Sequence, residues 1–387
     1  MIDTLKGEQS GMALGPSGAP HVLLVIDQLP NVLGGGERIA LKLAAMLPAY
    51  GYQPSILTFN SHAETSALAQ SPCPVYLLPL KRTYGWSAIR GALAFRRFLR
   101  DRQIRIVQTF FESSDLWGGT VTKLLSNAKL VWSRRDMGIL RRHKHALAYR
   151  LMSGMPDAVF AVSEGVRQHC ITVDGIDPER VKTIYNGLDP SHWNLISTRR
   201  RDGHQIRITT VGNIRRVKGH DVLLRAAGKI LREYPNVSFS IAGGVLERDY
   251  FKELQALAKE LDIVDQVHFC GAVSALREHL AESDIFVLPS RSEGFSNAII
   301  EAMAASLPVV ATNVGGNAEA IENGVSGYIV PSEDPDALAE AILRLVQDPE
   351  RAASMGARGK VIAESKFTEQ AMMKSIASAY AAILQEK

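Results

Sequence analysis

Twice along this chain, short apolar stretches alternate with amphipathic ones, and this alternation restricts the fold more than any other feature. The first stretch, residues 21–29, contains a continuous apolar run from Val22 to Ile26, which is typical of a strand buried on both faces. Helices are predicted between most of the strands, for example at 86–100 and 116–125. Alternating strands and helices predict a parallel, doubly wound sheet. The further strands of this first series are predicted at 55–59, 75–80, 106–110, 130–133, 158–162 and 182–185.

The alternation stops at about 187–205 and then restarts. This break contains Asp189-Pro190 and a basic run that ends at Asp202-Gly203, and polar stretches with Gly and Pro are typical of linkers. The second series of strands is predicted at 207–211, 237–242, 267–270, 285–289, 308–312 and 327–330. A chain of 387 residues, at roughly 150 residues per domain, fits about two domains.

These observations predict two doubly wound, Rossmann-like α/β domains in series. We expect a flexible leader at 1–20, an N-terminal domain at 21–190, a linker at 191–205 and a C-terminal domain at 206–367. A last helix at 368–387 is expected to pack back on the N-terminal domain. Ligands of such sheets bind at the carboxyl ends of the strands. Two domains that face each other would therefore form a central cleft.

The composition is that of an ordinary globular protein, with 46% hydrophobic and 22% charged residues and a net charge of +4. Low hydrophobicity and high net charge are both missing, which excludes disorder as the main state. Three scattered cysteines argue against a disulfide framework and against a zinc site, so we expect no metal and a cytoplasmic setting. No stretch reaches the roughly 18 apolar residues of a membrane-spanning helix, and the leader does not read as a signal peptide.

The segment from Ser290 to Met303 carries the richest chemistry. It follows a predicted strand and opens a helix; Gly294 permits a tight turn, and Ser296 can cap the helix with support from Asn297. The free N–H groups of the first helical turn then form an anion site suited to a diphosphate. Glu293 on the loop and Glu301 in the helix can accept hydrogen bonds from two sets of sugar hydroxyls. The alternative is a plain capped helix with surface glutamates.

This block resembles the E-x7-E signature of the retaining glycosyltransferases of family 4, which have the GT-B fold. The resemblance spans about residues 21–387 and is densest from 184 to 331. Other segments that resemble the family follow in the right order, namely 184–189, 211–219, 241–244, 269–271, 309–316 and 323–327. The ordered combination is more specific than any single piece.

The resemblance implies that the C-terminal domain holds a nucleotide sugar and that Lys218 meets its diphosphate. The position after Gly212, usually Arg in the family, is Asn213 here, so we expect Arg215 or Arg216 to supply the missing phosphate contact. By the same resemblance Glu301 would bind the ribose and Glu293 the transferred sugar. We therefore expect Glu293, Lys218 and Arg216 to be catalytic. The predicted donor-binding residues are Gly35, Gly36, Arg215, Arg216, Lys218, Gly294, Phe295, Ser296, Asn297 and Glu301.

Three glycines, Gly34 to Gly36, follow the first strand and allow the backbone to approach a ligand closely. Their spacing gives neither the dinucleotide-binding pattern nor a Walker A motif. In the family this loop lies near the donor phosphates and the acceptor. Glu37 could cap the helix or contact the acceptor.

At the end of the predicted strand 106–110 this chain departs from its family. Many members have a His-x-His pattern there, whereas this chain has Gln108 and Phe110, so a histidine base cannot be assumed. Retaining transfer in the family is commonly discussed as a front-face substitution that relies on positioning and charge stabilisation. The polar candidates on the N-terminal side are Glu112, Asp115 and Asp136, although Asp115 is also a good N-cap for the next helix.

Basic residues form two clusters in the N-terminal half, at 81–105 and 134–150. Helices with such charge could lie against anionic lipid headgroups, bind the diphosphate of an acceptor or form a solvated surface. Arg134 and Arg135 directly follow a predicted strand end, which favours acceptor contact. The acceptor-binding candidates are Glu112, Asp115, Arg134, Arg135 and Asp136.

The function that we expect is transfer of a hexosyl group from a nucleotide-diphosphate sugar to a sugar or lipid-linked acceptor, in polysaccharide or glycolipid assembly. The nucleotide sugar is a co-substrate, and no cofactor or metal is expected. A location in the cytoplasm or on the inner face of the cell membrane fits this function, and nucleic acid is not an expected partner. The alternatives are a nucleotide-sugar epimerase and a non-catalytic nucleotide-sugar-binding protein.

Overall fold

The computed structural model describes residues 18–29, 34–61, 71–80, 83–138, 143–193 and 205–386. The chain divides into two compact units, with residues 1–185 and 372–387 in unit 1 and residues 186–371 in unit 2. Unit 2 thus begins at residue 186, before the expected linker at 191–205. It ends at residue 371, four residues after the expected end of the C-terminal domain at residue 367. The expected leader and linker lie mostly outside the described residues, as do Lys81, Arg82, Arg141 and Arg142 of the basic clusters.

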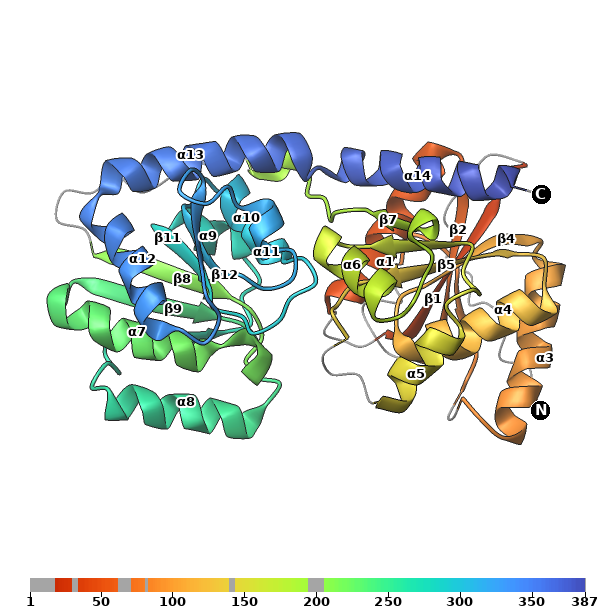
Figure 1. The fold of residues 1–387 in the computed structure, drawn as a ribbon, viewed down its shortest axis with the longest axis horizontal. Coiled ribbons are helices and arrows are strands. Elements are labelled where there is room, and N and C mark those ends of the chain that lie inside the picture. Colours follow the sequence, from red (N-terminus) through yellow and green to blue (C-terminus); the bar gives the residue numbers. More distant parts are fainter. Residues whose placement is uncertain are drawn as a thin grey trace. The chain divides into compact units, whose positions relative to one another are not determined.

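Unit 1 contains a seven-stranded sheet in the order β3-β2-β1-β4-β5-β6-β7 (Figure 1). Every neighbouring pair of strands is parallel. The predicted positions agree with the observed ones within about three residues at each end. The strands are β1 (His21–Leu29), β2 (Gln53–Ser61), β3 (Val75–Leu77), β4 (Ile104–Thr109), β5 (Lys129–Arg134), β6 (Ala158–Ala161) and β7 (Val181–Thr183).

Helices cover both faces of this sheet because the buried side chains of β1 alternate between two cores. Val22, Leu24 and Ile26 pack in one core with α1 (Gly35–Met46) and α14 (Glu369–Gln385). Leu23 and Val25 pack in the other core with α3 (Trp86–Asp101) and α4 (Gly119–Leu125). α5 (His143–Leu151) lies beside α4 (Figure 1). α6 (Glu164–Thr172) lies between β6 and β7 in sequence.

The C-terminal helix α14 belongs to the core of unit 1. Its buried side chains include Met373, Ile376 and Tyr380, and the Tyr380 hydroxyl donates a hydrogen bond to the side-chain oxygen of Gln108 on β4. Gln108 is 2% exposed and also donates to Ser133 Oγ on β5. Gln108, which stands where the resemblance described above leads one to expect histidine, therefore anchors the last helix to the sheet.

Unit 2 contains a six-stranded parallel sheet in the order β10-β9-β8-β11-β12-β13. Its large core contains buried side chains of α7, α8 and α12 and of the first turns of α13. Figure 1 shows α7 and α8 below the sheet and α10 above it. The strands are β8 (Ile206–Val211), β9 (Val237–Ala242), β10 (Val267–Gly271), β11 (Ile285–Leu288), β12 (Val309–Thr312) and β13 (Gly327–Val330). The helices are α7 (His220–Glu233), α8 (Arg248–Glu260), α9 (Leu276–Ala281), α10 (Asn297–Ala304), α11 (Asn317–Ala320), α12 (Pro335–Gln347) and α13 (Pro349–Lys366).

None of the helices that the structure describes is both long and apolar enough to cross a membrane.

Candidate active-site residues

In unit 2 the strand order reverses between β8 and β11, which are neighbours in the sheet but not in sequence. At such a switch point the loops after two adjacent strands turn in opposite directions and leave room for a ligand at the carboxyl ends. The loop after β8 runs through residues 212–219, and the loop after β11 runs through residues 289–296. Both loops contain residues that the sequence singled out.

Lys218 and Glu293 meet across this switch point. The Nζ atom of Lys218 lies 2.6 Å from Oε1 of Glu293, and the hydroxyl of the buried Ser290 donates to the same oxygen at 2.6 Å. The side chains of Lys218 and Glu293 are 25% and 11% exposed. The structure thus brings two of the three predicted catalytic residues into one hydrogen-bonded group that solvent still reaches.

A glycine holds the 289–296 loop against the next strand end. Gly315 has φ +52°, and a Cβ atom there would lie 1.8 Å from the carbonyl oxygen of Glu293. Gly316 N–H donates to the carbonyl of Gly294 at 2.9 Å, and the Thr312 hydroxyl donates to the carbonyl of Ser290 at 2.6 Å. These contacts with the end of β12 and the residues after it therefore hold the backbone before and after Glu293 in place.

The helix α10 begins directly after this loop. Ser296 occupies the N-cap position, but its side chain makes no capping hydrogen bond, so the expected Ser296 cap is wrong. Asn297 Oδ1 instead accepts a hydrogen bond from the side chain of Asn186 at 2.6 Å. Phe295 packs against Phe367 with ring centroids 5.2 Å apart. Glu301 is half-buried one turn inside the helix, as predicted from its spacing.

Arg215 and Arg216 are paired with acidic residues at the start of α8 and within it. Arg215 contacts Glu247 at 3.4 Å, and the Arg216 guanidinium pairs with Glu253 and stacks over the ring of Tyr250. The structure therefore brings Lys218, but neither arginine side chain, to Glu293. No pattern in the sequence indicates that the two arginines pair with Glu247 and Glu253, because these ion pairs depend on how α8 packs beside α7.

Two further residues at this edge were not predicted. The Arg291 guanidinium binds both carboxylate oxygens of Asp221 at 2.8 Å and donates to the carbonyl of Arg216, so it ties the two loops together. His220 follows the Lys218 loop and is 1% exposed, and burial, with help from Lys218, lowers its pKa to about 4. Its ring is therefore neutral at pH 7. The signal in the sequence that could have found Arg291 is a charged residue within three positions of a strand end.

Unit 1 has its own switch point between β1 and β4. Asp27, near the end of β1, accepts backbone hydrogen bonds from Ser113 and Ser114 at 3.2 and 2.8 Å. Burial raises the pKa of Asp27, and these hydrogen bonds oppose the rise. Asp27 was not among the predicted residues, although a carboxylate at the end of a buried apolar run is unusual enough to mark it.

The glycine-rich segment after β1 opens α1. Gly35 and Gly36 are the first two residues of this helix, and Gly36 lies so close to the ring of Phe111 that a Cβ atom would come within 2.6 Å of it. Glu37 is 7% exposed, and burial raises its pKa; the charge of Asp27 adds to that rise. Two carboxyl groups with raised pKa values thus lie near the carboxyl end of β1.

The other polar candidates of unit 1 lie at the ends of β4 and β5. Glu112 is half-buried and pairs with Nδ1 of His145 on α5. Arg135 is half-buried directly after β5, and the exposed Asp136 accepts a hydrogen bond from Gly138 N–H at 2.8 Å. Across the described ranges, no group of three or more His, Cys, Asp and Glu residues could hold a metal ion.

Asp115 and Arg134 lie inside the protein, which argues against the acceptor contact expected of them. Both oxygens of Asp115 accept hydrogen bonds, one from Thr109 and one from the Tyr149 hydroxyl at 2.7 Å. Arg134 is 3% exposed and pairs with the fully buried Asp174 at 2.8 Å. The expected and observed positions differ because β5 continues to Arg134, and because the chain is already helical at residue 112, three residues before Asp115.

Replacing Asp115 by Asn is expected to stabilise the protein relative to wild type as the pH rises. Burial raises the Asp115 pKa from 3.8 to about 7, although Arg134 opposes this rise, so ionisation favours the unfolded chain between about pH 4 and 7. The Asp115→Asn variant has no carboxyl group at this position and therefore does not lose stability in this way as the pH rises. Between pH 5 and 8 its free energy of unfolding should therefore gain about 2 to 3 kcal/mol over wild type, measured by urea unfolding.

The matched control is Glu179→Gln, which removes an exposed carboxylate of the same unit and so measures the general effect of losing one negative charge. If the difference in the free energy of unfolding between Asp115→Asn and wild type does not change with pH, the raised pKa of Asp115 is contradicted.

Two family models match consecutive parts of the chain. The family described as Glycosyltransferase Family 4 matches residues 33–192, and the family described as Glycosyl transferases group 1 matches residues 193–361. The boundary between the two matches falls within the expected linker.

Curated relatives match over shorter segments. An uncharacterized glycosyltransferase of Methanocaldococcus jannaschii, MJ1607, is 33% identical over 216 residues, which are 53% of this chain and 54% of the relative. A GDP-mannose-dependent alpha-(1-6)-phosphatidylinositol monomannoside mannosyltransferase of Mycolicibacterium smegmatis is 36% identical over 152 residues, 37% of this chain and 39% of the relative. The chain thus spans about half the length, or less, of these curated relatives.

Among solved structures, HepE from Anabaena in complex with UDP and glucose has a TM-score of 0.81 at 22% identity. The alignment covers 93% of this chain and 99% of HepE. At this identity the likeness shows a common fold, which agrees with the two Rossmann-like sheets described above. With family matches that run from residue 33 to residue 361, the chain belongs to the group 1 and family 4 glycosyltransferases of the GT-B fold.

Proposed function

We propose that this chain is a retaining glycosyltransferase that moves a hexosyl group from a nucleotide-diphosphate sugar to a sugar or lipid-linked acceptor, in polysaccharide or glycolipid assembly. The observation that carries this proposal is the hydrogen-bonded group of Lys218, Glu293 and Ser290 at the switch point of unit 2, directly before the N-terminus of α10. It combines a cation and a helix N-terminus for phosphate with a carboxylate for sugar hydroxyls.

Each part of the donor has a candidate partner in unit 2. The ammonium group of Lys218 and the first N–H groups of α10 would offset the charge of the diphosphate. Glu301 would accept hydrogen bonds from the ribose, and Glu293 would exchange its contacts with Lys218 and Ser290 for hydroxyls of the transferred sugar. Because Arg215 and Arg216 are held by Glu247 and Glu253, Lys218 would provide most of the positive charge.

The comparisons support a nucleotide-sugar donor and leave its base and sugar open. HepE is described in complex with UDP and glucose, whereas the mannosyltransferase of Mycolicibacterium smegmatis uses GDP-mannose. The latter is named for a phosphatidylinositol mannoside, which supports a lipid-linked acceptor for this chain as well.

The transfer itself would proceed on one face of the sugar. The bond from the anomeric carbon to the leaving phosphate oxygen breaks, the acceptor oxygen bonds to the same face, and the acceptor proton passes to the phosphate oxygen. Such a reaction needs charge stabilisation and positioning more than a side-chain base. This route fits the buried Gln108 and Phe110, which stand where many family members have histidines.

The acceptor would bind at the carboxyl ends of β1, β4 and β5 in unit 1. Glu112, Arg135 and Asp136 remain predicted contacts, and Asp27 and Glu37 join them as carboxyl groups at the same edge of the sheet. Among these, Arg135 would suit the phosphate of a lipid-linked acceptor.

A donor screen with a matched pair of variants tests the proposal. UDP-, GDP- and ADP-sugars are added to the protein, and the melting temperature is measured, because a ligand at about 100 times its Kd stabilises the native state by about 2.7 kcal/mol. Glu301→Ala should remove the stabilisation. Glu260→Ala, which removes an exposed glutamate from α8 of the same unit, should retain it.

The stabilising donor is then incubated with and without candidate sugar and lipid-linked acceptors, and the products are separated. We expect a product with the anomeric configuration of the donor. Stabilisation that persists in Glu301→Ala would contradict the site assignment. Conversion of the donor alone into a different nucleotide sugar would identify an epimerase instead.

A further inference from the structure

The exposed large hydrophobic side chains of unit 1 gather on the helices that cover one face of its sheet. Within the described residues, α1 and α14 on the opposite face carry no such side chain, and Val173, after α6, is the one exception in the unit. Isolated exposed hydrophobic residues are normal, but a gathering on neighbouring helices marks an interaction surface. The members, on or beside α3, α4 and α5, are Tyr84, Trp86, Ile89, Leu93, Leu124, Leu125, Leu147 and Leu151.

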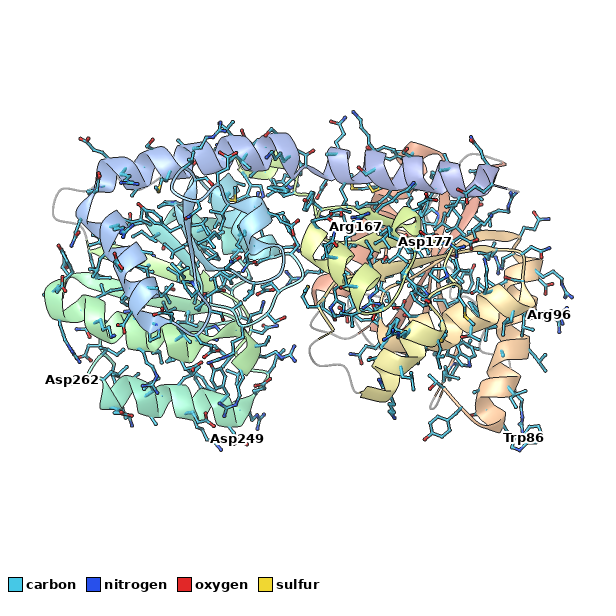
Figure 2. The ribbon with its side chains drawn as sticks, in the orientation of Figure 1. Trp86, Arg96, Arg167, Asp177, Asp249 and Asp262 are labelled. Carbon is cyan, nitrogen blue, oxygen red and sulfur yellow. The ribbon has the colours of Figure 1, made fainter. Side chains whose placement is uncertain are left out.

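The centre of this surface is the outer face of α3. Trp86, Ile89 and Leu93 follow helical spacing and are 77%, 53% and 57% exposed, whereas Phe95 and Phe98 on the inner face are buried. Figure 2 shows Trp86 pointing away from unit 1 at the start of the helix. A helix with one buried and one exposed apolar face has more apolar surface than its own unit covers.

Positive charge is interleaved with these apolar residues. Arg90, Arg96, Arg97 and Arg100 are exposed on the same outer face of α3, where Asp101 is the one acidic residue. α4 adds Lys123, and α5 adds Lys144 and Arg150, with no acidic residue in either helix. The three helices thus carry seven Lys and Arg against one Asp, in a chain whose total net charge is +4.

We propose that this surface, formed by α3, α4 and α5, binds anionic phospholipid bilayers. Trp86, Ile89 and Leu93 would enter the headgroup region, where aromatic and aliphatic side chains of interfacial helices lie. The arginines would extend their apolar stems along the helix and place their guanidinium groups at the lipid phosphates. The proposal deepens the proposed function, on which it rests for the lipid-linked acceptor, because it would hold the enzyme at the membrane that contains that substrate.

A second copy of this chain is a less suitable occupant of the same surface. Two copies facing each other through α3 would bring their clusters of arginines together, and like charges directly opposed disfavour association. An anionic bilayer satisfies the apolar and the basic residues at once. The charge of the surface therefore selects lipid over self-association.

Vesicle sedimentation with the full chain tests the proposal. Vesicles of pure phosphatidylcholine are compared with vesicles that contain about 30 mol % phosphatidylglycerol, at low and high salt. We expect at least tenfold stronger binding to the anionic vesicles, and weaker binding at high salt. Arg90→Gln/Arg96→Gln should lower the partition coefficient about 10- to 30-fold, from the contribution of each basic residue near an anionic surface. Trp86→Ser/Leu93→Ser should lower it about tenfold or more.

The control is Arg225→Gln/Arg232→Gln, which removes the same charge from exposed positions of α7 in unit 2 and should leave binding within about twofold of wild type. Equal binding to both kinds of vesicle, or equal losses in the α3 and α7 variants, would overturn the proposal. So would a dimer that forms without vesicles and depends on Trp86. Sedimentation needs no nucleotide sugar, and donor stabilisation is measured separately, so failure of the proposed transferase function would be distinguished from failure of membrane binding.

Discussion

Replacing Lys218 by Met is expected to lower kcat/KM about 10²- to 10³-fold with the donor that stabilises the protein. Met retains most of the apolar stem that packs on Gly212, where the Lys218 side chain lies 3.5 Å from the position of a Cβ atom. The substitution removes the ammonium group that is bound to Glu293. As the bond to the leaving phosphate breaks, negative charge builds on the diphosphate, so the loss should be larger in the transition state than in donor binding.

Arg216→Met is the informative comparison, because it removes a positive charge two residues away. The Arg216 side chain is mostly exposed and is held by Glu253 and Tyr250, so we expect less than a tenfold loss. Lys252→Met, which changes an exposed lysine of α8, should have no effect beyond error. If Arg216→Met is as damaging as Lys218→Met, Arg216 contributes to catalysis as the sequence predicted, and its pairing with Glu253 must break when donor binds.

The positions of the strands could be predicted because buried parallel strands consist of nearly continuous apolar residues, as from Val22 to Ile26. The meeting of Lys218 with Glu293 could be anticipated as well, since both residues follow strands of one predicted sheet. What could not be predicted depends on tertiary packing. The hydrogen bonds between Asp27 and the backbone of Ser113 and Ser114 join β1 to a helical segment that is distant in sequence, and they exist because β1 and β4 are neighbours.

Arg134 and Asp115 are buried, contrary to expectation, because β5 and the helical segment after β4 have other ends than the sequence predicted. A strand predicted to end at residue 133 places Arg134 on a loop, whereas one more residue of β5 directs this side chain onto the ring of Tyr149 and the carboxylate of Asp174. Element ends are the least certain part of a prediction from sequence. In doubly wound sheets ligands bind at those ends, so errors of one residue fall on the candidate site itself.

Replacing Gly219 by Ala is expected to destabilise unit 2 by about 2 to 5 kcal/mol and to weaken donor binding. Gly219 has φ +66°, which disfavours a side chain, and a Cβ atom would lie 2.0 Å from the carbonyl oxygen of Pro289. The clash can be relieved by separation of the Lys218 loop from the loop that carries Glu293. The same substitution should therefore disturb the Lys218–Glu293 contact.

Gly271→Ala provides the matched control, because Gly271 also has φ +66° but no atom lies within 4 Å of its Cβ position. It should cost about 1 to 2 kcal/mol from the backbone conformation alone and leave donor binding unchanged. The difference between the two variants, measured as the free energy of unfolding and as stabilisation by the donor, isolates the close approach of the two loops. If Gly219→Ala is no more harmful than Gly271→Ala, the carbonyl of Pro289 can move aside without cost, and the two loops would not need to be this close for donor to bind.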